Sequence, residues 1–263
     1  MTAVNQDRPL VLLHVPHTGG TSLIYVMTDQ VRRADYHFCH WDEFVANPLP
    51  PGVHVLQGHY DYCMIQTIMP DARVFLVVRD PIDRLISAYN YLQRTTDHPL
   101  HQRFCETVTC LEDFLFDPVL RDTVWNLQTR ILGFDYPFAD VITAVRAGEM
   151  EVGAALSEIT RRRSEFYQNF EYMLLNAVAR LRTVDHFALF DELEPAMRQL
   201  LKAEFDVEIG VFPKENATRA NQLHRATLTE DEIFLAKMYN TADVLLYEQA
   251  VRIHAERFGT KHR

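Results

Sequence analysis

The chain has 263 residues, of which 48% are hydrophobic, and its formal net charge is −10. The hydrophobic content is enough for a sizeable core and excludes wholesale disorder, and the acidic balance argues against nucleic-acid binding, which depends on clustered Lys and Arg. Residues 1–9 lack the apolar core of a signal peptide and no apolar run reaches membrane-spanning length, so we expect a cytoplasmic protein, or a soluble domain of a larger one, without a membrane span.

Three short apolar runs near the N-terminus predict buried parallel strands, at 9–15, 53–57 and 73–78. The first run leads into a loop with two adjacent glycines, and a helical pattern that includes Leu23 and Met27 follows. The third run is followed at once by Arg79-Asp80-Pro81. Because Pro81 suits the first turn of a helix, we predict a helix over 82–93.

The rest of the chain reads mostly as helices. Helical patterns occur at 111–116, 119–132, 152–159, 169–181, 192–205 and 229–258. One last strand is predicted at 186–190, and 206–222 is polar and irregular. Strands that alternate with helices predict a mostly parallel sheet covered by helices on both faces. No linker divides the chain, so we expect one domain over residues 1–263, of which 1–8 are flexible.

A strand that runs into a glycine-containing loop and then into a helix can bind an anion. The helix start directs backbone N–H groups and the positive end of the helix dipole at the loop. Gly19 and Gly20 let the backbone approach closely, and Thr21 and Ser22 add hydroxyl donors. The nucleotide-kinase pattern G-x-x-x-x-G-K-[ST] is incomplete, because its first Gly and its Lys are missing. An ordinary strand–helix turn would explain the two glycines equally well.

A second segment, at 79–89, favours the anion-binding interpretation. Arg79 follows a predicted strand at its carboxyl end, where open α/β sheets bind ligands, and its guanidinium can hold a phosphate through two hydrogen bonds. Ser87 lies two helical turns later and can donate one more hydrogen bond. Taken alone, the segment would also allow Arg79 to pair with Asp83.

Together, residues 14–22 and 79–89 resemble the two nucleotide-binding motifs of the sulfotransferases that use 3′-phosphoadenosine 5′-phosphosulfate (PAPS). The similarity is greatest to the branch of the heparan sulfate 2-O- and 6-O-sulfotransferases and their bacterial relatives. The first segment matches HxPKTGGTS at all but one fixed position, and the second matches RDPxxRxxSxY throughout. The resemblance implies a P-loop-like, three-layer α/β fold with a central, mostly parallel sheet flanked by helices and a helix-rich C-terminal half.

The resemblance also implies which residues bind the nucleotide. The 3′-phosphate of PAPS would lie on Arg79 and Ser87, which an unmodified nucleotide could not use. The 5′-phosphosulfate would lie on the loop residues Thr18, Gly19, Gly20, Thr21 and Ser22. Arg219 lies in the irregular stretch before the last helix, and we expect it to close over the nucleotide. PAPS is thus the expected sulfuryl donor and 3′-phosphoadenosine 5′-phosphate (PAP) the product.

The spacings of the four cysteines match no zinc or redox pattern. No metal is expected, because protein donors and the helix dipole can hold the phosphates of PAPS. Residues 126–130 look like a family segment near the acceptor cleft, so Asn126, Gln128 and Arg130 are predicted to contact the acceptor. We expect that acceptor to be a small molecule or a carbohydrate. The sequence indicates no oligomeric state.

Two histidines are candidates for catalysis. His59 follows a predicted strand and resembles the Gly-His segment that supplies the base in the heparan-type branch; a structural loop histidine is the alternative. His17 occupies the position where the family pattern has Lys, which carries a fixed positive charge. We hypothesise that bound phosphosulfate raises the pKa of His17, so that an imidazolium stabilises or protonates the leaving group. The alternative is weakened activity with nucleotide binding retained.

The predicted function is therefore transfer of a sulfuryl group from PAPS to a hydroxyl of a carbohydrate or other hydroxylated metabolite. The predicted mechanism is an in-line displacement with a histidine base. Two other interpretations are open: a non-catalytic protein that binds PAPS or PAP, and a P-loop nucleotide kinase.

Overall fold

The computed structural model describes residues 8–31, 35–47, 49, 52–166, 169–212 and 222–259. Within these ranges, five parallel strands form one sheet in the order β2–β3–β1–β4–β5. The strands are β1 (Leu10–Leu13), β2 (Tyr36–Phe38), β3 (Val55–Gly58), β4 (Arg73–Val78) and β5 (His186–Leu189). In the central pairing, Leu13 of β1 lies opposite Gly58 of β3 and Leu76 of β4. The carboxyl ends of these strands therefore meet at one edge of the sheet.

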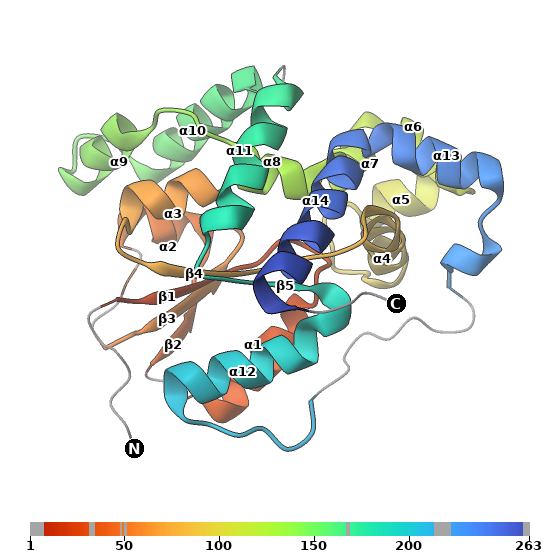
Figure 1. Cartoon of the computed structure of the whole chain (residues 1–263). Coiled ribbons are helices and arrows are strands. Elements are labelled where there is room, and N and C mark those ends of the chain that lie inside the picture. The colour runs from red at the N-terminus through yellow and green to blue at the C-terminus, as the bar shows by residue number, and fades with distance from the viewer. Residues whose placement is uncertain are drawn as a thin grey trace.

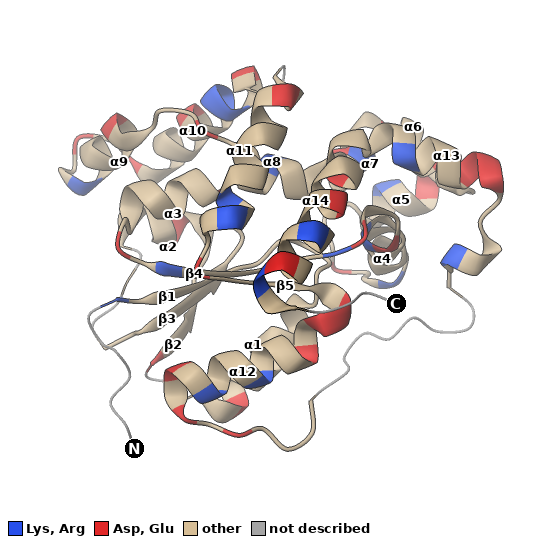
Figure 2. Ribbon diagram, viewed as in Figure 1, with Lys and Arg blue, Asp and Glu red and all other residues tan. Residues whose placement is uncertain are grey.

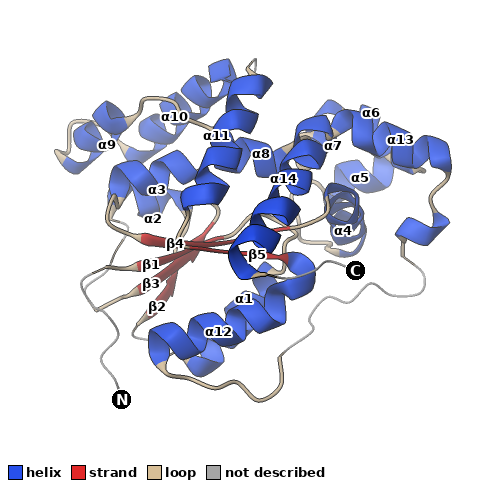
Figure 3. Cartoon of the chain, viewed as in Figure 1, coloured by secondary structure: helices blue, strands red, loops and turns tan. Residues whose placement is uncertain are grey.

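Helices cover both faces of the sheet, which explains why β1 and residues 74–78 of β4 are continuous apolar runs (Figures 1 and 3). On one face, Leu10 and Leu12 pack in a core with α1 and α12. On the other face, Val11 and Leu13 pack in a larger core with helices from the middle and the end of the chain. The bounds of the first pair are α1 (Gly20–Gln30) and α12 (Leu193–Phe205). The second layer contains α2 (Trp41–Ala46), α3 (Tyr62–Ile68), α8 (Leu127–Gly133), α9 (Ala139–Arg146), α10 (Val152–Phe166), α11 (Phe170–Thr183) and α14 (Thr241–Phe258).

A third core joins the helix after β4 to later helices, at the right of Figure 1. Its members are α4 (Pro81–Arg94), α5 (His101–Thr107), α6 (Leu111–Phe116), α7 (Pro118–Arg121) and α13 (Glu230–Tyr239). Two short 3₁₀ turns, η1 (Phe190–Glu192) and η2 (Arg225–Thr227), complete the described elements. Figure 2 shows that the Lys, Arg, Asp and Glu residues lie mostly on the helices around the sheet. Among the described residues, no helix is both long and apolar enough to cross a bilayer.

The predicted α/β class, the parallel sheet with helices on both faces and the helix-rich C-terminal half are confirmed. Two predicted helices were wrong because each is interrupted at an asparagine. The segment 119–132 is divided where Asn126 adopts the left-handed conformation, with φ 44°, which asparagine tolerates better than most residues. The segment 229–258 is divided at Asn240.

The two interruptions bond to each other. The backbone N–H of Asn126 donates to Oδ1 of Asn240 over 3.1 Å, and the backbone N–H of Asp243 donates to Oδ1 of Asn126, also over 3.1 Å.

Several short elements were not predicted from the sequence: strand β2 and helices α2, α3, α5 and α9. It did predict the start of α13, where Thr229 and Glu232 form a capping box.

Candidate functional site

The loop between β1 and α1 has the geometry of an anion-binding turn. His17 and Gly19 both have positive φ, 68° and 91°, and the Thr18 hydroxyl donates to the Val15 carbonyl over 2.7 Å. The N-cap of α1 is Gly19, which has no side chain to occupy the first N–H groups, and no acidic residue lies in the first turn. The loop therefore faces an uncapped, electropositive helix start.

Packing within the protein also requires the two glycines. A Cβ on Gly20 would lie 1.8 Å from the His14 ring, and one on Gly19 would lie 2.6 Å from Cδ2 of Leu193. These contacts would be present in an ordinary strand–helix turn as well. The glycines alone therefore do not decide between the two interpretations of the loop, and the residues around it must do so.

His59 lies directly after β3, beside the loop. The backbone N–H of His14 donates to the Gly58 carbonyl over 2.9 Å, and Nδ1 of His59 lies 2.8 Å from the His14 carbonyl oxygen. The His14 and His59 rings contact each other, with centroids 4.4 Å apart and planes tilted by 31°. Because a carbonyl only accepts, Nδ1 of His59 must carry the hydrogen, which leaves Nε2 of the neutral ring as a proton acceptor.

The surroundings of His59 keep this ring neutral at physiological pH. Desolvation lowers the pKa of His59 below 6.5 and the nearby His40 lowers it further, while the bond to the His14 carbonyl opposes them. The side chain is nevertheless exposed, so solvent limits the desolvation and acceptor molecules can reach the ring. An exposed imidazole with a free Nε2 suits the predicted role of base.

His17 is neutral when no anion is bound. Burial lowers the pKa of His17 to about 3, and the positive charges of Arg84, Arg79 and Arg94 contribute. The hypothesised imidazolium therefore depends on a bound anion, whose negative charge would oppose the arginines and raise this pKa. The cationic surroundings are themselves suited to a phosphosulfate group.

Arg79 and Ser87 both line one cavity of about 140 Å³. The remaining lining residues are Asp83, Ile86, Leu223, His224 and Arg225. Nη1 of Arg79 donates to the His17 carbonyl over 2.9 Å, and its guanidinium lies 4.1 Å from the centroid of the Phe190 ring. Nε of Arg79 is buried without a hydrogen-bond partner among the described residues. The structure thus brings the two motifs together through the contact of Arg79 with the loop.

Arg225 is a further cavity residue that the sequence analysis missed. Its Nη1 lies 3.0 Å from Asp80 and 3.3 Å from Asp83, so Asp83 forms its ion pair with Arg225 and not with Arg79. The sequence signal was a basic residue in the stretch before the last helices, and Arg219 in the same stretch was predicted instead. Arg219 lies outside the described residues.

The three residues predicted to contact the acceptor are buried behind the arginine motif. Gln128 exchanges two 2.9 Å hydrogen bonds with the backbone of Arg79. Nη1 of Arg130 donates to the carbonyls of Asp122 and Trp125, and Asn126 bonds to the C-terminal helices as described above. These contacts support the position of Arg79, and contact of the three residues with an acceptor stays a prediction.

Buried Asp243 connects the same segment to the arginine motif. Its carboxylate accepts from the backbone N–H groups of Gln128 and Thr129 and lies 3.6 Å from Nη2 of fully buried Arg84. The C-terminal helix α14 thereby holds both α8 and α4 in place. A buried ion pair of this kind fixes the relative position of the elements that it joins.

Comparison with known proteins finds similarity to sulfotransferases. The model of the Sulfotransferase family matches residues 1–116. A crystal structure of a sulfotransferase from Alicyclobacillus acidocaldarius is similar over 94% of this chain and 96% of its own, with 16% identity and a TM-score of 0.45. Mouse sulfotransferase SULT7A1 complexed with PAP is similar over 99% of this chain and 88% of its own, with 11% identity and a TM-score of 0.39. No curated protein matches the sequence. The part of the chain that holds the loop, His59 and the arginine motif is thus the part that is similar to the Sulfotransferase family.

Proposed function

We propose that this protein transfers the sulfuryl group of PAPS to a hydroxyl of a carbohydrate or another hydroxylated metabolite. The proposal rests on one observation: Arg79 and Ser87 line the same cavity. A hydrogen bond from Arg79 to the His17 carbonyl connects this cavity to the loop. A nucleotide with phosphates at both ends would use both motifs at once. ATP and AMP lack the 3′-phosphate and would leave the arginine cavity without a ligand.

In this proposal, the loop and the start of α1 hold the 5′-phosphosulfate. Thr18, Gly19, Gly20, Thr21 and Ser22 are the proposed contacts, and the uncapped N–H groups of α1 supply the positive potential. Arg79 and Ser87 hold the 3′-phosphate. The residues present fit PAPS, since a buried Arg79 donor and a cationic environment around His17 both call for an anion.

The proposed reaction is an in-line displacement at sulfur. Nε2 of His59 takes the proton of the acceptor hydroxyl while the new oxygen–sulfur bond forms. The bond between sulfur and the 5′-phosphate oxygen breaks, and that oxygen leaves with the negative charge as part of PAP. The helix start and an anion-induced His17 imidazolium stabilise this charge. No metal is needed for these steps.

A non-catalytic protein that binds PAPS or PAP is the second candidate, and the histidine at position 17 favours it. Lysine would carry its charge at every physiological pH, whereas this histidine is neutral until an anion arrives. Such a protein would keep the preference for 3′-phosphorylated nucleotides without transferring sulfate. A nucleotide kinase is disfavoured, because the loop lacks the lysine of that pattern.

Transfer of labelled sulfate tests the proposal. The protein is incubated with ³⁵S-labelled PAPS and with pooled carbohydrates, and separately with pooled small hydroxylated metabolites. We expect labelled product from at least one pool, and loss of that product in His59→Gln. Tight PAP binding with no transfer to either pool would instead support the non-catalytic protein.

A further inference from the structure

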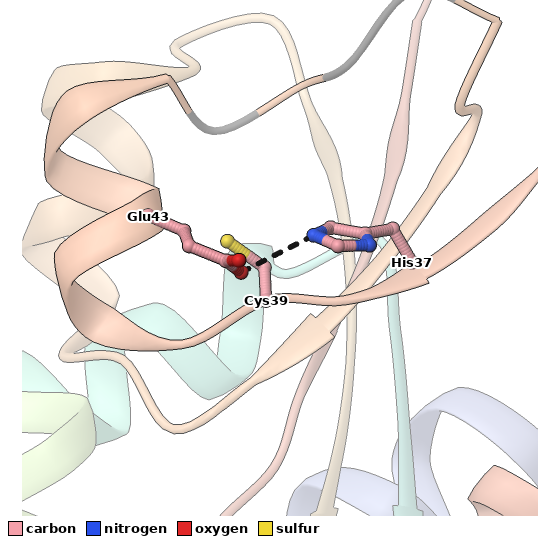
Figure 4. A group of neighbouring side chains, drawn as sticks. All are labelled: His37, Cys39 and Glu43. Carbon is pink, nitrogen blue, oxygen red and sulfur yellow. Dashed lines mark ion pairs between the residues drawn. The ribbon is translucent and has the colours of Figure 1, made fainter.

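Three potential metal ligands lie together between β2 and α2 (Figure 4). They are Nε2 of His37, Sγ of Cys39 and a carboxylate oxygen of Glu43, and these atoms all lie within 4.8 Å of one another. His37 and Glu43 already contact each other, with Nε2 and Oε2 3.3 Å apart. No step of the proposed sulfuryl transfer uses this group of side chains.

The backbone holds the three residues in this arrangement. His37 and Cys39 are two positions apart along an extended segment, so their side chains share one side. The N–H of Cys39 donates to the Gln57 carbonyl over 2.9 Å and thereby continues the pairing of β2 with β3. Glu43 is the third residue of α2, and its carboxylate accepts from the His40 N–H over 3.2 Å. The group is therefore preorganised by a strand on one side and a helix start on the other.

The donor set is that of a zinc site. Imidazole nitrogen, thiolate sulfur and carboxylate oxygen are the three ligand types that Zn²⁺ takes in proteins, at bond lengths that place neighbouring ligand atoms about 3–4 Å apart. His37 and Glu43 already have that spacing, and the Cys39 sulfur lies within 4.8 Å of both ligand atoms. The side chains of His37 and Glu43 are 33% and 50% exposed, which gives an ion access. Cys39 is only 1% exposed and forms the buried side of the group.

We infer that His37, Cys39 and Glu43 form a Zn²⁺ site whose fourth position is open to water. When the ion binds, the Cys39 thiol releases its proton to solvent and the thiolate sulfur bonds to the metal. The site joins the end of β2 to the start of α2. Phe38, between two of the ligands, points to the opposite side of the segment and contacts the His59 ring with centroids 6.2 Å apart. Bound zinc therefore stabilises the segment that carries Phe38 without taking part in the reaction.

Metal titration of the whole protein tests the inference. Protein without a polyhistidine tag is stripped with a chelator, and Zn²⁺ is then added in competition with a chromophoric chelator. Co²⁺ in place of Zn²⁺ reports the sulfur ligand through its thiolate-to-metal absorption. We expect one ion per chain, thiolate absorption with Co²⁺, and a higher melting temperature in the presence of Zn²⁺.

Three variants distinguish Zn²⁺ binding at this site from Zn²⁺ binding at other cysteines. Cys39→Ser and Glu43→Gln should weaken Zn²⁺ binding by about 100-fold, since even residues that only support a ligand contribute 10–100-fold. Glu43→Gln keeps the helix cap, because Gln serves at that position too, so it decides the matter if Cys39→Ser does not fold. Cys105→Ser, at an exposed cysteine on α5, should bind as wild type does. Absence of stoichiometric binding, or equal binding by Glu43→Gln and Cys105→Ser, would overturn the inference.

Discussion

Nη1 of Arg79 donates a 2.9 Å hydrogen bond to the backbone carbonyl of His17, 62 residues earlier in the chain. The arginine that closes β4 thus holds the loop that follows β1, and the two strands are neighbours in the sheet. The position of one proposed phosphate contact consequently fixes the position of the other. A ligand that occupies both must carry anionic groups at two ends, as PAPS and PAP do.

Ser87 should contribute modestly to binding of the 3′-phosphate. Ser87→Ala removes one hydroxyl donor from the cavity without changing its charge, so PAP affinity should fall by about 2–10-fold. Affinity for AMP should not change, because AMP has no group at this position. Isothermal titration of both nucleotides measures the difference. Ser157→Ala, at an exposed serine of α10, is the matched control and should alter neither affinity.

Protonation of His59 should set how steeply and where activity falls at acidic pH. The base must be neutral, so activity is lost as the pH falls through the pKa of His59, which lies below the usual 6.5. His59→Gln should lower kcat by about 100-fold or more and leave PAP affinity unchanged. His54→Gln replaces the histidine that directly precedes β3 and should retain activity. Equal loss in both variants would contradict a role for His59 as the base.

His17 should take up a proton when the nucleotide binds. Its pKa of about 3 in the free protein means that it is neutral at pH 7, and a bound anion raises that pKa. PAP binding should therefore be accompanied by proton uptake, measured by calorimetry in two buffers of different ionisation enthalpy. His17→Lys should abolish the uptake and extend activity to higher pH, because lysine keeps its charge there. Binding by the wild type without proton uptake would rule out the imidazolium.

Gly20 should be required for the stability of the loop. Gly20→Ala places a Cβ 1.8 Å from the His14 ring, and relief of that contact should cost about 1–3 kcal/mol of the free energy of unfolding. His14 would move and displace the His59 ring that contacts it, so kcat should fall as well. Gly153→Ala, in α10 with open space around the new Cβ, should instead stabilise by about 0.5–1 kcal/mol. Urea denaturation of both variants compares the two changes.

The sequence predicted best the features that depend on local patterns. β4 forms at 73–78 as predicted because Val74 to Val78 are all apolar and buried. Arg79 and Ser87 were identifiable because a strand end and two helical turns fix their relative position. The same local reasoning predicted the loop at 14–22, where β1 ends and α1 begins.

The features that depend on distant contacts could not be read from the sequence. The breaks at Asn126 and Asn240 arise from hydrogen bonds between residues more than one hundred positions apart. Arg225 enters the cavity because Asp80 and Asp83 hold it there. Likewise, no cysteine spacing indicated the group at Cys39, since its other members are a histidine and a glutamate brought near by the turn into α2.

The measurement that tests the central claim most directly is a calorimetric titration of the protein with PAP, AMP and ATP in the same buffer. We predict that PAP binds about 100-fold more tightly than AMP or ATP, because a charged, two-bond contact of Arg79 with the 3′-phosphate contributes about 3 kcal/mol. In Arg79→Ala this preference should disappear, and AMP affinity should fall less than PAP affinity, because AMP loses only the support that Arg79 gives to the loop. Tighter binding of ATP than of PAP, or a PAP preference that survives in Arg79→Ala, would contradict the claim.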